Sequence, residues 1–316
     1  MSTDSIRMLD AQETQKRLPY RDLIQKLEVG FRDNINAPLR HHHITGSYET
    51  YSNNLLLMPA WSKFGFGGIK IVNVNPGNGL RKLPSINSTY LLFEQETGRH
   101  LLLMDGKVLT QRRTAAASVL AAKFLARKDS RHLLIVGAGQ VAKSIAQAYQ
   151  VAFPLREITI FNRSVENAHR LADEIDNQNI SVTVSEDLSK SVAEADIISC
   201  ATLAQDPLIK GKWLKPGQHL DLIGSYTSTM READDDVIKR ARIYIDTEHA
   251  LQESGDLLIP LQTGVIDTVS IQGTLSELCH KKALGRTSQN EITLFKSVGS
   301  ALEDLAAAEL VYRSLS

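Results

Sequence analysis

A glycine-rich segment, Gly137-Ala138-Gly139-Gln140-Val141-Ala142, has the residue types and spacing to bind the pyrophosphate of a dinucleotide. Gly137 permits a tight turn, Gly139 lets the backbone approach a phosphate, and Ala142 is small enough for a helix to pack on the preceding strand. The motif alone is weak evidence. Here it follows an apolar run at residues 133–136 and precedes a helical pattern, which favours a nucleotide site over an ordinary turn.

The residues after the next apolar strand indicate which dinucleotide to expect. In dinucleotide-binding folds an Asp or Glu at this position holds the adenosine ribose diol. Here residues 158–161 are followed by Asn162, Arg163 and Ser164, which offer a cation and a hydroxyl instead of a carboxylate. Because these groups suit a 2′-phosphate, the sequence predicts NADPH as the cofactor and NADH as the weaker alternative.

Two basic residues lie at positions where a buried charge is unfavourable or where a bound anion is favoured. Lys70 lies in the apolar run 67–74, where a lone ammonium on a buried strand needs an anion. Arg113 opens a run of small residues, 113–118, expected to begin a helix whose N-terminal amides favour a negative group. Both positions favour a bound carboxylate or phosphate. The alternative is a lysine that reaches solvent and an arginine that caps a helix, and the pattern does not decide between them.

Composition excludes several classes of partner. The 316 residues include 36 Lys and Arg and 36 Asp and Glu, so no net charge favours nucleic acid or anionic lipid. Residues 1–17 are polar, and no stretch approaches the roughly 20 apolar residues that span a bilayer. We therefore expect a cytosolic protein with two domains that binds neither nucleic acid nor membrane.

The histidines and cysteines do not predict a metal or nucleophilic site. His41, His42 and His43 are adjacent, so on a strand they point to opposite faces and suit no single ion. We expect them to be exposed or partly packed. Cys200 and Cys279 are too few for a disulfide framework, and the apolar run around Cys200 is typical of a packing residue.

The elements that position these residues fall into two parts. From residue 115 onward, helical patterns alternate with short apolar runs, which predicts a doubly wound parallel sheet of the Rossmann type over residues 115–296. A last helix is expected over residues 293–312. The expected strands cover residues 133–136, 158–161, 180–184, 196–200, 219–223 and 243–246.

The first part has a different pattern. Two helical patterns, at residues 11–18 and 20–34, precede alternating runs separated by turn signals, which predicts an α+β domain with an antiparallel sheet covered by helices. We expect this domain to span residues 1–114 and to be completed by residues 297–316. The alternating runs cover residues 54–58, 68–74, 88–94 and 100–104.

Seven segments in the same order resemble the ornithine cyclodeaminase and mu-crystallin family. The similarity runs from about Pro38 to the C-terminus. The segments are Lys70-Ile71-Val72 with Asn75-Pro76-Gly77-Asn78, residues 109–118, 137–142 and 223–225, Arg231-Glu232, residues 285–287, and residues 291–299.

The resemblance implies a substrate-binding and dimerisation domain joined to a Rossmann domain, and hence a homodimer. It implies that Lys70 and Arg113, with Arg40, bind the carboxylate of a small-molecule substrate. The expected cofactor-binding residues are Thr114, Gly137, Gly139, Gln140, Val141, Asn162, Arg163, Ser164, Ala201, Thr202, Ile223, Ser225, Ser297, Val298 and Gly299.

One departure from the family pattern bears on the reaction. Cyclodeaminases carry an Asp two residues after the glycine that matches Gly224, and this chain has Tyr226 there. A phenol is a poor substitute for a carboxylate base. The stretch around Tyr226 is more similar to the family's reductases of Δ1-pyrroline-2-carboxylate and Δ1-piperideine-2-carboxylate, which form proline and pipecolate. The alternatives are an ornithine cyclodeaminase or alanine dehydrogenase, and a non-catalytic NADPH-binding protein of the mu-crystallin type. For the reductase, Lys70 or an ordered water is the expected proton donor.

Overall fold

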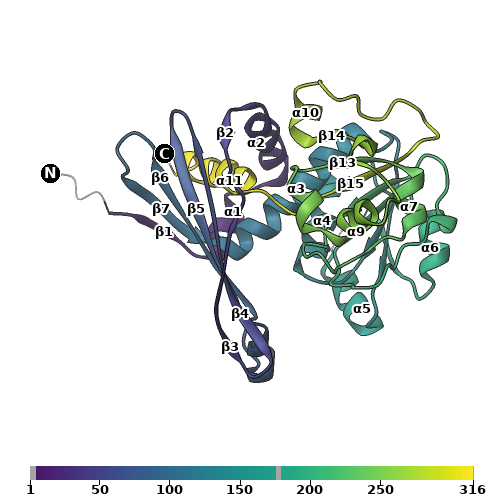
Figure 1. The fold of residues 1–316 in the computed structure, drawn as a ribbon, viewed down its shortest axis with the longest axis horizontal. Coiled ribbons are helices and arrows are strands. Elements are labelled where there is room, and N and C mark those ends of the chain that lie inside the picture. Colours follow the sequence, from purple (N-terminus) through teal and green to yellow (C-terminus); the bar gives the residue numbers. More distant parts are fainter. Residues whose placement is uncertain (1–4, 176–178, 316) are drawn as a thin grey trace. The chain divides into compact units, whose positions relative to one another are not determined.

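The chain divides into two compact units in the computed structural model, which describes residues 5–175 and 179–315. The first unit is Met1–Thr114 with Ser300–Ser316, and the second is Ala115–Gly299 (Figure 1). The long helix α3 (Gly106–Leu125) contains the boundary between them. Residues 297–299, expected in the first domain, fall in the second unit.

The sheet of the first unit has seven strands in the order β1-β7-β6-β5-β4-β2, with β3 paired to β4. Neighbouring strands are antiparallel as expected, with the exception of β1, which runs parallel to β7. No hairpin joins these two strands, and hence no turn fixes their relative direction. The strands are β1 (Arg7–Leu9), β2 (Ile35–Asn36), β3 (His41–Tyr48), β4 (Tyr51–Ser62), β5 (Phe66–Val74), β6 (Ile86–Glu94) and β7 (His100–Asp105).

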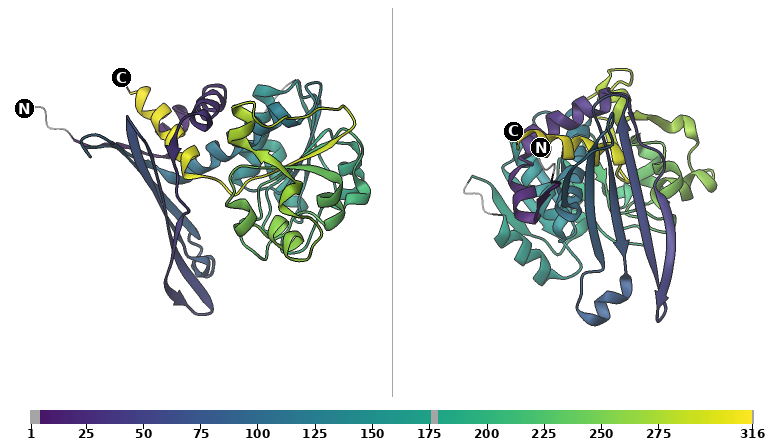
Figure 2. Two further views of the ribbon diagram at one scale, coloured as in Figure 1. Left: turned by 45° about the horizontal axis from the view of Figure 1, so that its top comes forward. Right: turned by 90° about the vertical axis from the view of Figure 1, so that its left-hand side faces the viewer.

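Helix α11 (Ala301–Arg313) packs on this sheet beside α2 (Tyr20–Arg32), as Figure 2 shows. A side chain on Gly30 would place its Cβ 3.0 Å from the Cβ of Ala306, so small residues set the close approach of the two helices. Helix α1 (Ala11–Lys16) precedes α2, with Asp10 as its N-cap.

The second unit contains an eight-stranded sheet in the order β10-β9-β8-β11-β12-β15-β13-β14. Every pairing in it is parallel, which confirms the doubly wound class. The strands are β8 (His132–Val136), β9 (Glu157–Phe161), β10 (Ser181–Val184), β11 (Ile197–Cys200), β12 (His219–Leu222), β13 (Ala241–Ile245), β14 (Ile271–Thr274) and β15 (Ile292–Lys296).

Helices connect these strands. They are α4 (Gln140–Ala152), α5 (Val165–Glu174), α6 (Leu188–Glu194), α7 (Asp235–Arg240), α8 (Ala250–Glu253), α9 (Gly255–Gln262) and α10 (Leu275–Cys279). The described residues also form the short 3₁₀ helices η1 (Pro76–Arg81), η2 (Gly211–Trp213) and η3 (Thr268–Ser270). Within the described ranges, no helix has the length and apolar character needed to cross a membrane.

The prediction of a last helix over residues 293–312 was wrong for the residues before Ala301. Residues 292–296 form the buried strand β15, and the helix begins only at Ala301, where the hydroxyl of Ser300 accepts a hydrogen bond from the N–H of Leu302. A short apolar run does not distinguish a buried strand from a buried helix, and the pairing of β15 with β12 and β13 decides it here. The sequence interpretation therefore missed β15, and it also contained no strand at the position of β14.

Candidate dinucleotide pocket and buried cation cluster

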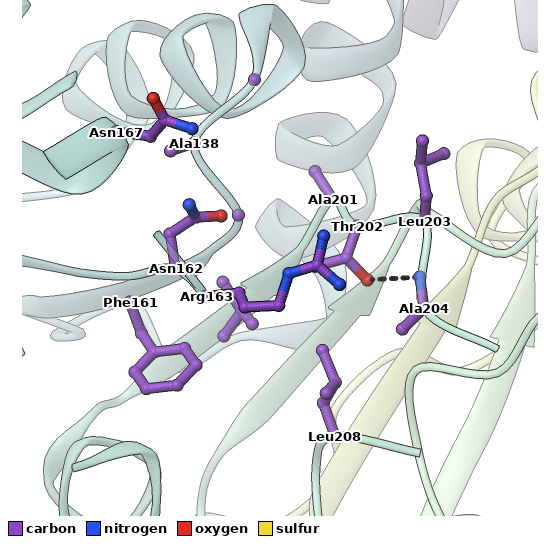
Figure 3. Close-up of a pocket in the computed structure, with 13 residues that line it drawn as sticks. Ala138, Phe161, Asn162, Arg163, Asn167, Ala201, Thr202, Leu203, Ala204 and Leu208 are labelled. Atoms are coloured by element: carbon purple, nitrogen blue, oxygen red, sulfur yellow. Dashed lines mark hydrogen bonds between the residues drawn. The ribbon is translucent and has the colours of Figure 1, made fainter. Parts of the chain in front are cut away.

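A pocket of about 430 Å³ lies at the carboxyl ends of β8, β9 and β11 in the second unit (Figure 3). This edge of a parallel sheet is where doubly wound folds bind their ligands. The pocket is lined by Val136, Gly137, Ala138, Gly139, Phe161, Asn162, Arg163, Asn167, Ala201, Thr202, Leu203, Ala204 and Leu208. Six of the expected cofactor residues are among them.

The glycine turn has the backbone that a pyrophosphate site requires. Gly137 has a φ of 118°, and a Cβ there would lie 2.6 Å from the carbonyl oxygen of Ala201. A Cβ on Gly139 would have no atom within 4 Å, so the space beside this backbone is open. Gly139 is also the N-cap of α4 and offers no side-chain cap, which leaves the first amides of the helix to other acceptors. These residues fit a dinucleotide.

The three residues after β9 differ in their surroundings. Asn162 donates through Nδ2 to the carbonyl of Ser164 at 2.9 Å, and the hydroxyl of Ser164 caps α5 by accepting from the N–H of Asn167 at 3.3 Å. Arg163 is exposed and extends into the pocket (Figure 3). Across residues 5–175 and 179–315 no carboxylate pairs with Arg163, so this cation is available to a ligand.

The other expected cofactor residues lie outside the lining of this pocket. Ser225 is fully buried, and its hydroxyl is hydrogen-bonded to the carbonyl of Met230 and the hydroxyl of Ser254. Thr114 lies in the first unit and is buried. The remainder lie in the second unit and are not among the lining residues: Gln140, Val141, Ser164, Ile223, Ser297, Val298 and Gly299.

A buried carboxylate that the sequence interpretation missed holds the turn after β15. Asp246 follows β13 and is 1% exposed. Its Oδ2 accepts hydrogen bonds from the N–H groups of Val298 at 2.8 Å and Gly299 at 2.6 Å. An acidic residue directly after an apolar strand was the available signal.

In the first unit, Lys70 and Arg113 meet on the carboxylate of Asp304. Lys70 is 2% exposed, and its Nζ lies 2.9 Å from Oδ1 and 2.8 Å from Oδ2 of Asp304. Arg113 donates through Nε to Oδ1 of the same carboxylate at 2.8 Å and through a terminal nitrogen to Glu303 at 2.7 Å. The structure thus brings both predicted cations together in one buried cluster, on β5, α3 and α11.

Burial and charge shift the pKa values of this cluster. Burial lowers the pKa of Lys70 to about 8; Asp304 opposes this shift, and Arg113 and Arg40 add to it. For Asp304, the positive charges of Arg113 and Lys70 outweigh burial and hold the pKa of the carboxyl below its usual value. For Arg113, the two carboxylates outweigh burial and raise the pKa. Near neutral pH the cluster is therefore ionised.

Two expectations about these cations need correction. Arg113 does not open a helix, because α3 begins at Gly106, where the carboxylate of Asp105 accepts from the N–H of Val108 at 2.7 Å. The anion that Lys70 requires is also not missing, since Asp304 supplies it. Acidic residues on the otherwise apolar helix α11 were the signal for this pairing.

Arg40 lies between β2 and β3 and is half-buried. Its charge contributes to the lowered pKa of Lys70, which places it within electrostatic range of the cluster. The histidine run His41–His43 forms the exposed start of β3, as expected. Among the described residues, no group of three His, Cys, Asp or Glu side chains could hold a metal ion.

Comparison with known proteins adds to this geometry. A family model described as "Ornithine cyclodeaminase/mu-crystallin family" matches residues 5–316. The Δ1-pyrroline-2-carboxylate reductase of Paracoccus denitrificans is 37% identical over 310 residues, which cover 95% of this chain and 94% of the relative.

Two solved structures are similar over nearly the whole chain. Thermococcus litoralis Δ1-pyrroline-2-carboxylate reductase, in complex with NADH and L-proline, has a TM-score of 0.91 at 32% identity and covers 97% of this chain and 96% of its own. An archaeal alanine dehydrogenase dimer with bound NAD has a TM-score of 0.90 at 28% identity and covers 98% of this chain and 95% of its own.

Proposed function

Because this chain belongs to the ornithine cyclodeaminase/mu-crystallin family, we propose that it reduces a cyclic imine carboxylate with a nicotinamide cofactor. The substrate is Δ1-pyrroline-2-carboxylate or Δ1-piperideine-2-carboxylate, and the product is L-proline or L-pipecolate. The observation that carries the proposal is the buried cluster of Lys70 and Arg113, in a chain that also holds a dinucleotide pocket. Its reductase relatives span almost its full length.

The charge of the cluster suits a monocarboxylate. Lys70 and Arg113 both bind the carboxylate of Asp304, and Arg40 adds positive charge near Lys70. A substrate carboxylate is attracted to these cations, and the guanidinium of Arg113 favours a planar anion. These residues thereby fix the orientation of the imine ring.

The nicotinamide, when bound, supplies a hydride to C2 of the imine. The ring nitrogen needs a proton, and we assign its donation to the Nζ of Lys70. With a pKa of about 8, this ammonium is protonated at neutral pH yet gives up its proton more readily than an exposed lysine. The neutral amine left on Lys70 regains a proton from solvent, so one hydride and one proton complete the reduction.

Tyr226 argues against the deaminating alternatives. It stands where cyclodeaminases carry an Asp, and its side chain is 46% exposed. A phenol is a poor substitute for the carboxylate base that deamination uses. We therefore place deamination second to imine reduction, although the archaeal alanine dehydrogenase shares the fold.

The cofactor is a nicotinamide dinucleotide, and we propose NADPH as the preferred form. Arg163 supports this choice because it is exposed, lines the pocket and follows the strand whose end meets the adenosine ribose. Ser164 contributes less than the sequence suggested, since its hydroxyl caps α5.

We further propose a homodimer formed through the sheet of the first unit. Side chains alternate along a strand, so Ile69 and Ile71 point away from the face on which Lys70 meets α11. Their cross-strand neighbours continue an apolar patch that is only partly buried in the single chain. A second copy of this chain would cover it. The patch consists of Leu57, Pro59, Ile69, Ile71, Leu91 and Leu103.

A single set of assays tests the function. Oxidation of NADPH and NADH is followed with Δ1-pyrroline-2-carboxylate, Δ1-piperideine-2-carboxylate, and pyruvate plus ammonia. We expect oxidation with one or both cyclic imines and little with pyruvate. Turnover only with pyruvate plus ammonia, or release of ammonia from ornithine, would establish a deaminating enzyme instead. Cofactor binding without any turnover would favour a non-catalytic binding protein.

A further inference from the structure

A buried carboxylate, Glu232, joins two loops at the carboxyl edge of the second sheet. Its side chain is 0% exposed. Oε1 accepts hydrogen bonds from the N–H and the hydroxyl of Thr202, both at 2.8 Å, and Oε2 accepts from the N–H of Gly224 at 2.7 Å. Thr202 follows β11 and Gly224 follows β12, so one carboxylate connects the loops after adjacent strands.

The loops that Glu232 joins are packed against the dinucleotide turn. A Cβ on Gly224 would lie 2.0 Å from the carbonyl oxygen of Thr202, so the two loops are in direct contact. Ala201, the residue before Thr202, lies against Gly137 of the glycine turn. Both Ala201 and Thr202 line the pocket in Figure 3. The carboxylate is therefore hydrogen-bonded directly to a residue of the pocket wall.

Other charged groups surround this carboxylate. Asp256 on α9 accepts hydrogen bonds through Oδ1 from the N–H of Glu232 at 2.7 Å, and its Oδ2 lies 3.4 Å from Nζ of Lys296 on β15. Lys296 is also 0% exposed, and Cys200 on β11 is the neighbouring thiol. Glu232, Asp256 and Lys296 thus form a buried cluster with more acidic than basic groups.

We propose that Glu232 is a positioning residue for the cofactor, which in its ionised form holds the Thr202 and Gly224 loops so that the second unit binds the dinucleotide. The inference deepens the proposed function, because it concerns the cofactor site of the same enzyme. Glu232 does not line the pocket and acts through Thr202.

The hydrogen-bond partners explain why ionisation matters. The N–H groups of Thr202 and Gly224 can only donate, so a proton on Glu232 has the hydroxyl of Thr202 as its acceptor. Burial and the charge of Asp256 raise the pKa of Glu232 to about 7, against Lys296 and the Thr202 hydrogen bonds, which lower it. Below neutral pH the carboxyl takes up a proton and its hold on the two loops weakens.

The first test measures the dissociation constant of NADH by titration calorimetry between pH 6 and pH 8.5, with no imine present. NADH is chosen because the 2′-phosphate of NADPH itself titrates near pH 6. If only the ionised form binds well, affinity falls by about tenfold from pH 8 to pH 6, and binding near pH 6 releases close to one proton. An affinity for NADH that is constant over this range in the unmodified protein overturns the proposal.

Variants of Glu232 distinguish a role in positioning the cofactor loops from a role in the stability of the fold alone. Glu232→Gln places an N–H₂ against donors, and we expect NADH affinity at pH 8 to fall by about tenfold or more and to lose its pH dependence. Glu232→Asp keeps an ionisable group and should retain a pH-dependent affinity. Glu194→Gln, the same change at a half-exposed position on α6, is the matched control and should behave like the unmodified protein.

These binding experiments can fail or succeed independently of the proposed imine reduction, because NADH binding does not require that reaction. Thermal unfolding is measured in parallel. If Glu232→Gln lowers the melting temperature and leaves the affinity and pH profile for NADH unchanged, Glu232 has a structural role only and the proposal is wrong. If the variant does not fold, the pH dependence in the unmodified protein still decides.

Discussion

The Nζ of Lys70 lies 2.8 Å from Oδ2 of Asp304, and Oδ1 of that carboxylate accepts a hydrogen bond from Nε of Arg113. One anion therefore holds two buried cations that come from β5 and α3. An anion shared in this way fixes both cations in place and keeps Lys70 charged despite its burial. A substrate carboxylate bound here, as we propose, would add to an ion-paired cluster and would not fill a gap beside a lone ammonium.

Lys70→Met tests the role of the ammonium. Methionine keeps much of the volume of the side chain and removes the charge, while Arg113 still pairs with Asp304. We expect kcat/KM for the cyclic imine to fall at least 100-fold, about 2.7 kcal/mol of transition-state stabilisation, with NADPH affinity nearly unchanged.

Lys26→Met is the matched control for Lys70→Met. Lys26 pairs with Glu309 on the same helix α11 at 2.7 Å, so its removal also breaks an ion pair to that helix. It should leave kcat/KM unchanged. Normal turnover by Lys70→Met would show that Lys70 neither binds the carboxylate nor donates the proton.

Asp304→Asn tests the pH dependence. Because burial lowers the pKa of Lys70 to about 8, kcat/KM for reduction should fall as the pH rises through 8 and the ammonium is lost. The charge of Asp304 raises the pKa of Lys70, so Asp304→Asn should lower that pKa further. The alkaline limb of the pH profile, where kcat/KM falls with rising pH, should then move to lower pH. Glu309→Gln, on the same helix, should leave the limb in place, and a limb that does not move in Asp304→Asn would exclude Lys70 as the titrating group.

Arg163→Ala tests the cofactor preference. Without this guanidinium the 2′-phosphate of NADPH loses its cation, so the ratio of kcat/KM for NADPH to that for NADH should drop by about 1.5–3 kcal/mol, tenfold or more. Steady-state kinetics with both cofactors measure the ratio. Arg156→Ala serves as the control, because Arg156 is exposed and lies directly before β9, at the end of that strand away from the pocket. Equal use of both cofactors by the unmodified protein would contradict the assignment of NADPH.

Ile71→Glu tests the proposed dimer. Ile71 is 39% exposed in the single chain, and a carboxylate there would meet an apolar surface in the dimer. Sedimentation velocity at micromolar concentration should give twice the mass of the chain for the unmodified protein and a smaller species for the variant. Val29→Glu changes an exposed apolar residue on α2, away from the patch, and should stay dimeric. A monomeric unmodified protein refutes the dimer.

The sequence by itself determined the features that depend on neighbouring residues. The turn at Gly137 needs a positive φ that glycine adopts without strain, and this requirement is visible in the motif. The apolar neighbours of Lys70 likewise indicated that one face of its strand is buried, and alternating strand and helix patterns predicted the parallel sheet.

Only the tertiary structure decided which groups meet. Asp304 is 234 residues from Lys70, and the two are joined because α11 packs back on the first sheet. The contacts of Glu232 could not be predicted from the sequence for the same reason, since its partners Thr202 and Gly224 become neighbours only when β11 pairs with β12. Periodicity reports which face of an element is buried and does not report what covers it, so counter-ions and loop anchors far apart in sequence need the fold.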